Sequence, residues 1–416
     1  MVLNYIWIAF FLIGFIVALL KLIILGQTDI FNIMMSDLFN SAKTGFDISI
    51  GLTGMMALWL GIMKIGEGAG MVNVFARAVH PFFKTIFKGI PKGDPAYGNI
   101  AMNFSANMLG LDNAATPLGL KAMSDLQNLN PQKERATDAQ IMFLVLNTAG
   151  ITLIPSSVIA IRQTMAIEQH IPNFNAADIF LPILIATFIA FTAGMIITAL
   201  FQKINLLKGP VILFVLGFGG LIFGLAAWLQ HYPPDIMGKY IGLVGSLVIL
   251  GIIISFLAAG LIKRLNVYEL FVEGAKEGFT TAVRIIPYLI AMLAAISVFR
   301  TSGCMDFLVN GIAHLVALCG LNTDFVPALP VAFMKPLSGS GARGLMVDVL
   351  QTHGVNSFAG KLASIIQGST ETTFYVLAVY FGSVQVKDTR YALICGLIAD
   401  AIGILAAIIV GYLFFH

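Results

Sequence analysis

Charge is the scarcest property of this chain. Asp, Glu, Lys and Arg make up 11% of its 416 residues, whereas soluble domains carry about 25%. Apolar residues make up 58%, and the mean hydropathy is +0.91. This composition excludes a soluble multidomain protein. With a net charge of only +3, we expect the lipid bilayer as a partner, and no nucleic acid.

Cysteine and the motifs of cofactor chemistry are scarce too. The three cysteines have no paired spacing, and the six histidines lack the spacing of metal ligands. The chain contains no H-E-x-x-H motif and no G-x-x-x-x-G-K-[ST] phosphate loop. We therefore expect no disulfide framework, no metal site, no cofactor and no ATP-driven pump.

Long apolar runs fill most of the chain. A helix needs about 20 apolar residues to cross a bilayer, and runs near or above that length lie at 5–25, 46–66, 139–161, 178–201, 211–229, 241–262, 281–299, 361–382 and 391–414. The first run has no basic residue before it and no cleavage pattern after it, which favours a retained helix over a signal peptide. We predict an all-α, multi-pass protein of the cell inner membrane.

The sequence also repeats itself at a fixed offset. Residues 41–46 (Ser-Ala-Lys-Thr-Gly-Phe) recur as 274–279 (Gly-Ala-Lys-Glu-Gly-Phe), an offset of 233 (274 − 41). The same offset pairs Gly70 with Gly303, Ser105 with Ser338, and Asn107 with Ser340. We predict two pseudosymmetric repeats, 1–205 and 234–416, joined by a linking helix in 206–233. Whether the second repeat is inverted relative to the first stays open.

Two stretches of mixed polarity occur in each repeat. The first pair is 37–47 and 269–277, and the second pair is 69–87 and 304–318. Apolar residues recur in them at helical spacing, which is typical of amphipathic helices. We expect these helices to lie in the membrane interface or to pack across the bundle.

Polar, helix-breaking segments interrupt the apolar sequence in both repeats. Segments 99–119 and 330–344 combine Gly and Pro with hydroxyl and amide side chains, and a second polar pair lies at 147–157 and 367–373, at the heads of the following apolar helices. Broken backbone at membrane depth is tolerated only where it faces protein or a watery cavity. Four such segments predict a binding site between the repeats, built from broken or re-entrant helices.

The candidate site residues are the hydroxyl, amide and charged side chains of these four segments. Such groups suit a small polar solute, and their oxygens could equally coordinate Na⁺. The alternative is that small polar residues only let helices pack closely. The candidates are Asn103, Ser105, Asn107, Asn113, Asn147, Thr148, Ser338, Ser340, Arg343, Gln367, Ser369, Thr370, Glu371 and Thr372.

Glu371 stands out because its carboxylate lies among threonines beside an apolar helix. Acids inside membranes cost about 2.5 to 3.5 kcal/mol on insertion scales and indicate function by default. We expect Glu371 to accept a coupling proton or a hydrogen bond from the solute; a helix end at headgroup level is the alternative. Arg343 could pair with Asp348 or Glu371, or face an anionic solute.

The sequence also resembles two known families, one in each repeat. Segment 110–123 (Gly-Leu-Asp-Asn-Ala-Ala-Thr-Pro-Leu-Gly-Leu-Lys-Ala-Met) resembles the spore maturation protein A family. Segments 273–279, 286–289, 295–300 and 367–374 (Gln-Gly-Ser-Thr-Glu-Thr-Thr-Phe) resemble spore maturation protein B. The resemblance implies a fusion of the two, each part carrying a nucleoside-recognition or Gate domain.

That domain is shared with concentrative nucleoside transporters. Residues 367–371 are similar to the hairpin that contacts nucleoside there, with Gly and Gln in reverse order and Ser369 inserted, and 103–105 are similar to an Asn-Phe-Ser segment. The resemblance implies a secondary transporter of a nucleoside-like or other ring-bearing metabolite.

The sequence therefore favours a facilitative or ion-coupled transporter, with Glu371 as the coupling residue and Na⁺ or H⁺ as the ion. Two alternatives from other classes remain: a membrane scaffold or envelope-maturation factor, and a membrane enzyme acting on an envelope precursor. No pair of nucleophile and base is visible in the sequence, so we expect no catalytic residues and no enzyme. Pseudosymmetry also permits a homodimer.

Overall fold

The computed structural model describes residues 2–91, 93–232 and 234–416, without the side chains at 2–3, 112–114 and 234–235. Within these ranges the regular structure is helical, without a named strand. Seven helical segments are long and apolar enough to cross a membrane, and they cover 4–25, 30–68, 176–202, 209–229, 236–262, 267–301 and 392–415. The predicted all-α, multi-pass fold is therefore confirmed.

The helices of the first part of the chain recur in the same order in the second part. The first set comprises α1 (Val2–Leu25), α2 (Ile30–Gly68), α3 (Met71–Ile86), α4 (Ala96–Met108), α5 (Asp112–Asn128), α6 (Asp138–Thr148), α7 (Ser156–Glu168) and α8 (Phe180–Gln202). A linking helix, α9 (Gly209–Leu229), follows. The second set comprises α10 (Pro234–Ile262), α11 (Val267–Thr301), α12 (Cys304–Leu318), α13 (Leu329–Met334), α14 (Gly339–His353), α15 (Phe358–Ser369), α16 (Thr373–Ser383) and α17 (Ala392–Phe415). The division into domains at 205 and 233 stays a prediction.

The offset of 233 residues holds through the early helices of the two sets. α3 and α12 begin one residue after Gly70 and Gly303, which both have positive φ, 72° and 86°. Glycine adopts this left-handed conformation without the steric cost that a Cβ imposes. Each set thus uses a glycine to turn sharply from its long second helix into a short amphipathic one.

Of the two placements predicted for the first pair of amphipathic segments, packing across the bundle is the one observed. Residues 37–47 and 269–277 are not separate helices, because they lie in the early turns of the long helices α2 and α11. No proline or left-handed residue interrupts either helix between these turns and the apolar part, so the backbone hydrogen bonds continue. Their mixed polarity arises because these turns pack on the opposite long helix.

α2 and α11 form an antiparallel pair with two-fold pseudosymmetry. A Cβ on Gly278 would lie 2.5 Å from Cα of Ala57, and a Cβ on Gly45 would lie 3.2 Å from Cα of Ile290. The two contacts are equivalent at the repeat offset, since 278 − 45 and 290 − 57 both equal 233. A two-fold axis that exchanges two antiparallel helices lies perpendicular to both. The repeats are therefore inverted if these helices cross the bilayer.

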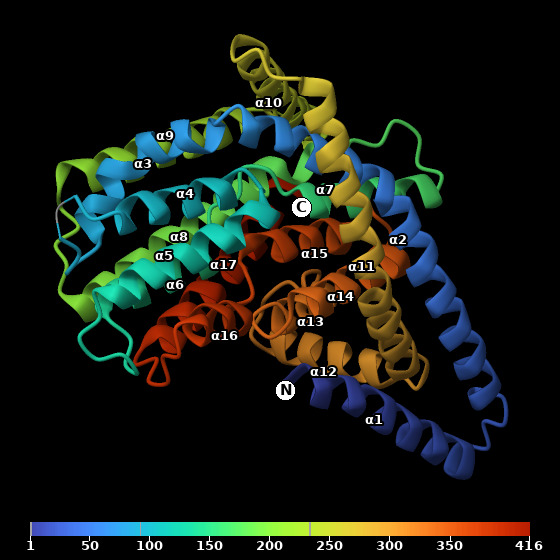
Figure 1. The fold of residues 1–416 in the computed structure, drawn as a ribbon. Coiled ribbons are helices and arrows are strands. Elements are labelled where there is room, and N and C mark those ends of the chain that lie inside the picture. The colour runs from blue at the N-terminus through green and yellow to red at the C-terminus, as the bar shows by residue number, and fades with distance from the viewer. Residues whose placement is uncertain (1, 92, 233) are drawn as a thin grey trace.

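α8 and α17 cross in the same manner at the centre of the molecule. A Cβ on Gly194 would lie 3.3 Å from Cβ of Ala399, and a Cβ on Gly403 would lie 2.9 Å from Cβ of Ala190. These contacts are also equivalent, at an offset of 209 (403 − 194 and 399 − 190). The apolar part of α8 is 78% buried, whereas that of α1 is 11% buried. Figure 1 shows α1 at one edge of the molecule and α17 inside it.

Candidate functional site

Four breaks in the helical structure surround the centre of the molecule. They separate α4 from α5 (109–111), α6 from α7 (149–155), α13 from α14 (335–338) and α15 from α16 (370–372). The polar interruptions at 147–157 and 367–373 thus divide the apolar runs 139–161 and 361–382 into two helices each. The following helices, α7 and α16, begin at the ends of these interruptions, as the sequence predicted.

Backbone hydrogen bonds join these breaks to one another. Within the first set, the Leu153 N–H donates to the Met108 carbonyl at 2.9 Å, and within the second, the Phe374 N–H donates to the Pro336 carbonyl at 3.2 Å. Between the sets, the Glu371 N–H donates to the Thr148 carbonyl at 2.7 Å. These bonds satisfy backbone groups that the interrupted helices leave unpaired, and they hold the four breaks in one place.

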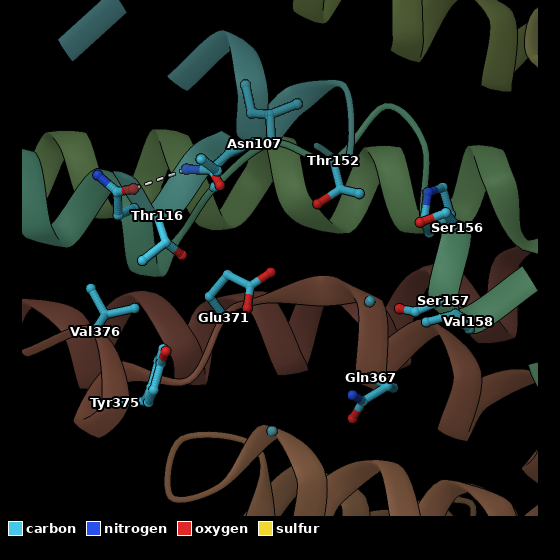
Figure 2. A pocket seen from close by; sticks show the side chains of 18 of the residues that line it. Asn107, Thr116, Thr152, Ser156, Ser157, Val158, Gln367, Glu371, Tyr375 and Val376 are labelled. Carbon is cyan, nitrogen blue, oxygen red and sulfur yellow. Dashed lines mark hydrogen bonds between the residues drawn. The ribbon is translucent and has the colours of Figure 1, made fainter. Parts of the chain in front are cut away.

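A cavity of about 410 Å³ lies among the four breaks (Figure 2). This volume is in the range of small-molecule sites. Gly110, Gly150, Lys335 and Glu371 each reach it from a different break. Its other polar lining residues are Asn107, Thr116, Asn147, Thr152, Ser156, Ser157, Arg343, Gln367, Tyr375 and Tyr380.

Five of the candidates named from the sequence line this cavity: Asn107, Asn147, Arg343, Gln367 and Glu371. The Asn107 side-chain amide donates to the Asn147 carbonyl oxygen at 2.9 Å, which orients both amides. Residues 370–372 join α15 to α16, and we call this turn with the two helix ends the Glu371 hairpin. The Glu371 side chain is exposed in the cavity, and Figure 2 shows it pointing from this hairpin toward the side that carries Thr116 and Asn107. A carboxylate thus faces neutral amides and hydroxyls across the cavity.

Most of the other candidates are buried, and several bond to nearby backbone. Asn103 donates to the Ala115 carbonyl at 2.8 Å, and Ser105, Ser338 and Ser369 bond within one turn of their own segments. Ser340 bonds Ser338 at 3.2 Å and lines a smaller pocket that also contacts Arg343. Thr148, Thr370 and Thr372 are buried around the hairpin. The side chain of Asn113 lies outside the part of the chain that the structure describes.

Several lining residues were absent from the candidates. Thr152, Ser156 and Ser157 lie in a predicted polar segment, and Lys335 is a charge beside a predicted break, so composition gave a signal for them. Tyr375 and Tyr380 lie in apolar α16, where the local sequence gives none. Tyr380 reaches the cavity because Gly119 has no side chain: a Cβ there would overlap the Tyr380 ring.

The start of α14 carries a glycine pattern that the candidate list did not use. Residues 339–344 read Gly-Ser-Gly-Ala-Arg-Gly, the glycine spacing found where backbones approach phosphates. Here the motif follows a helix break rather than a strand, and Ser338 caps the helix by accepting from the Gly341 N–H at 3.0 Å. Gly339 and Arg343 line the cavity. A helix N-terminus and a guanidinium at one wall both favour negative charge.

One alternative from the sequence paired Arg343 with Asp348, and the structure contradicts it. Asp348 instead accepts hydrogen bonds from Arg300, one of them 3.0 Å from Nε to Oδ1. The last turn of α11 packs on α14, and Arg300 is the cation within reach there. This partly buried pair holds α14 against the long helices, and Arg343 lines the cavity.

The fold and the cavity define a polytopic membrane protein with a central polar site built from two related halves. Residues 49–165 and 282–387, more than half of the chain, match the Gate family, described as nucleoside recognition, and the chain belongs to this family. It is 47% identical to spore maturation protein B of Bacillus subtilis over 171 residues, which cover 41% of this chain and 94% of that protein. It is 39% identical to spore maturation protein A of the same organism over 206 residues, 50% of this chain and 98% of that protein. The two relatives match different parts of the chain, as in a fusion. No solved structure matches the chain significantly.

Proposed function

We propose that this protein is a secondary transporter of a small polar solute across the inner membrane. The observation that carries the proposal is the cavity among four helix breaks, two from each set. The hairpin that bears Glu371 contacts Gly403, and Gly403 contacts Ala190; these residues lie about halfway along α17 and α8. The cavity therefore lies beside the midpoints of two helices that are long enough to cross a membrane. This position supports a transporter, because inverted-repeat transporters bind their solutes near the middle of the bilayer.

The chemistry of the lining supports a solute rich in hydroxyl and amide groups. Gln367 and Glu371 stand on one wall, and Thr116 and Asn107, whose side-chain amide donates to Asn147, stand on the other. Glu371 accepts hydrogen bonds, whereas the amides both donate and accept. A nucleoside-like or other ring-bearing metabolite presents matching groups, and the family's description as nucleoside recognition supports this class.

A thermal-shift screen of the purified protein tests the proposal. The panel contains nucleosides, nucleobases, amino acids, dicarboxylates and envelope-derived sugars, each with and without Na⁺. A ligand at about 100 times its Kd stabilises the folded state by about 2.7 kcal/mol. We expect a stabilising solute whose effect is lost in Glu371→Gln and kept in Glu134→Gln, because Glu134 is a surface acid paired with Lys387.

Flux separates transport from scaffolding. The stabilising solute should enter protein-containing liposomes with saturable kinetics. Absence of flux for the whole panel under H⁺ and Na⁺ gradients contradicts the transporter. If Glu371→Gln and Gln367→Ala then still support the protein's role in cells, the scaffold is the better account.

A further inference from the structure

A second pocket lies away from the central cavity, where the two sets of helices meet at one end of the molecule. Its volume is about 560 Å³, in the range of small-molecule sites. It is lined by the end of α5 and the start of α6 (126–139), by the loop after α3 (88–90) and by Arg390, which precedes α17. The lining residues described for the two pockets do not overlap, so this is a separate place in the fold.

This pocket lies at the ends of two helices that are long enough to cross a membrane. The Lys88 ammonium donates to the carbonyl of Gln202, the last residue of α8, at 3.4 Å, and Arg390 lies two residues before α17. Tyr391 stacks on Phe201 with ring centroids 4.9 Å apart, and tyrosine is enriched at membrane–water interfaces. If α8 and α17 cross the bilayer, the pocket is at the depth of the lipid headgroups.

The loop that forms one wall of the pocket is ordered by its own hydrogen bonds. Asn130 is 3% exposed, and its side-chain amide donates to the Arg135 carbonyl at 2.9 Å. Its side-chain oxygen accepts from the Gln132 N–H at 2.9 Å. The Ala136 N–H donates to the Asp388 carbonyl at 2.9 Å, and Figure 1 shows the α5/α6 and α16/α17 loops side by side. A preformed wall loses little conformational entropy when a ligand binds.

Positive charge prevails in this pocket. Its charged lining residues in the described part of the chain are three cations and one acid: Lys88, Arg135, Arg390 and Asp138. Arg390 Nη1 donates to Asp138 Oδ1 at 2.8 Å, and Arg135 Nε pairs with Asp388 Oδ2 at 3.2 Å. With Asp388 counted, the net charge is +1 (3 − 2). The bond of Lys88 is to a neutral carbonyl, and each guanidinium has further N–H groups beyond these bonds.

The acids whose side chains lie outside the described part of the chain are remote from this pocket. Asp112 lies fourteen residues before Leu126 on α5, about 20 Å away at the rise of an α-helix. Asp235 follows the far end of α9, whose 21 residues span about 30 Å. Neither carboxylate can neutralise the pocket at contact distance.

The start of α6 adds backbone donors to the cations. Asp138 and Ala139 are the first two residues of this helix, and both line the pocket. Their N–H groups have no acceptor within the helix, whereas the Gln140 N–H donates to the Thr137 side chain in a capping box. A helix N-terminus beside cations favours the oxygens of a phosphate group.

We propose that this pocket is a second binding site, which takes the phosphate group of an anionic ligand, and that the ligand is the headgroup of a membrane phospholipid. Lys88 and Arg135 donate to the phosphate oxygens from the first set of helices, and Arg390 donates from the second. Basic pockets between membrane helices bind anionic headgroups. The bound headgroup thus bridges the two sets and stabilises their junction. This inference does not depend on the proposed transport function.

Thermal unfolding of the full chain in a neutral detergent tests the site. We expect phosphatidylglycerol to raise the Tm more than phosphatidylcholine does, and Lys88→Gln or Arg135→Gln to weaken its apparent affinity about tenfold or more. Lys208→Gln is the control, because Lys208 is an exposed cation six residues after Gln202 and outside the lining. Lys88→Gln should fold, since it removes one bond of 3.4 Å to the backbone.

The outcomes separate a specific site from general surface charge. Equal Tm shifts with the two lipids overturn the proposal, and so does a Lys208→Gln variant that loses the shift as fully as Lys88→Gln. Native mass spectrometry gives a readout that is independent of stability: wild type should retain phosphatidylglycerol that Lys88→Gln releases, and equal retention contradicts the site.

Glycerol 1-phosphate distinguishes the two sources of a phosphate group, because it lacks acyl chains. No shift with this probe, together with a shift for phosphatidylglycerol, supports the lipid. A shift as large as that of phosphatidylglycerol, lost in Lys88→Gln, keeps the phosphate site and overturns the lipid as its source.

Discussion

Gly403 allows the hairpin of Glu371 to rest directly on α17. In Gly403→Ala, the new Cβ would lie 2.6 Å from Thr370 and 2.9 Å from Ala190, and overpacking of this kind costs about 1–3 kcal/mol. We expect a lower Tm in detergent. Gly217→Ala in α9 is the control, because nothing lies within 4 Å of its added Cβ, and alanine favours a helix by about 1 kcal/mol over glycine. Equal changes in Tm would contradict the tight seat of the hairpin.

For single residues, the sequence indicated which segments carry polar side chains near the cavity, but not which of those side chains point into it. Asn103 and Asn107 are one helical turn apart, yet Asn107 faces the cavity and Asn103 bonds the Ala115 carbonyl of α5. Which amide meets a cavity depends on where the neighbouring backbone runs. Composition does not contain that information.

The α2/α11 pair is held by glycines on both sides of its pseudo-two-fold axis. Gly45→Leu and Gly278→Leu should both destabilise the protein, because either side chain would strike the backbone of the opposite helix, Ile290 or Ala57. Gly54→Leu is the matched control in the same helix, with nothing within 4 Å of its Cβ. Denaturation of the three variants in detergent checks this. A Gly54→Leu variant as unstable as the other two would argue against the described pairing.

The sequence predicted where helices break better than it predicted where two segments join into one helix. Gly, Pro and amide residues at 99–119 and 330–344 indicated that the backbone is interrupted there, as it is. The merging of 37–47 into α2 was missed, because a charged, amphipathic stretch has the same composition whether it lies on a membrane or against another helix. Only tertiary packing distinguishes these two environments.

The pseudosymmetry of the whole molecule predicts that its two halves have opposite orientations across the membrane. Lys43 and Lys276 are equivalent at the repeat offset (276 − 43) and both are exposed. Lys43→Cys and Lys276→Cys, each in a background without Cys304, Cys319 and Cys395, should react with a membrane-impermeant thiol reagent from opposite sides of the membrane. The measurement is labelling of intact cells compared with inverted vesicles. Labelling of both from one side would contradict the inverted arrangement.

The linking helix α9 has a consequence for assembly. It docks through a narrow stripe, Val211, Gly219, Ile222, Ala226 and Leu229, and its 21 residues span about 30 Å. Tethering keeps one half near the other. A covalent link therefore fixes the stoichiometry at one to one: every copy of one half is made with a copy of the other, and neither has to find its partner by diffusion in the bilayer.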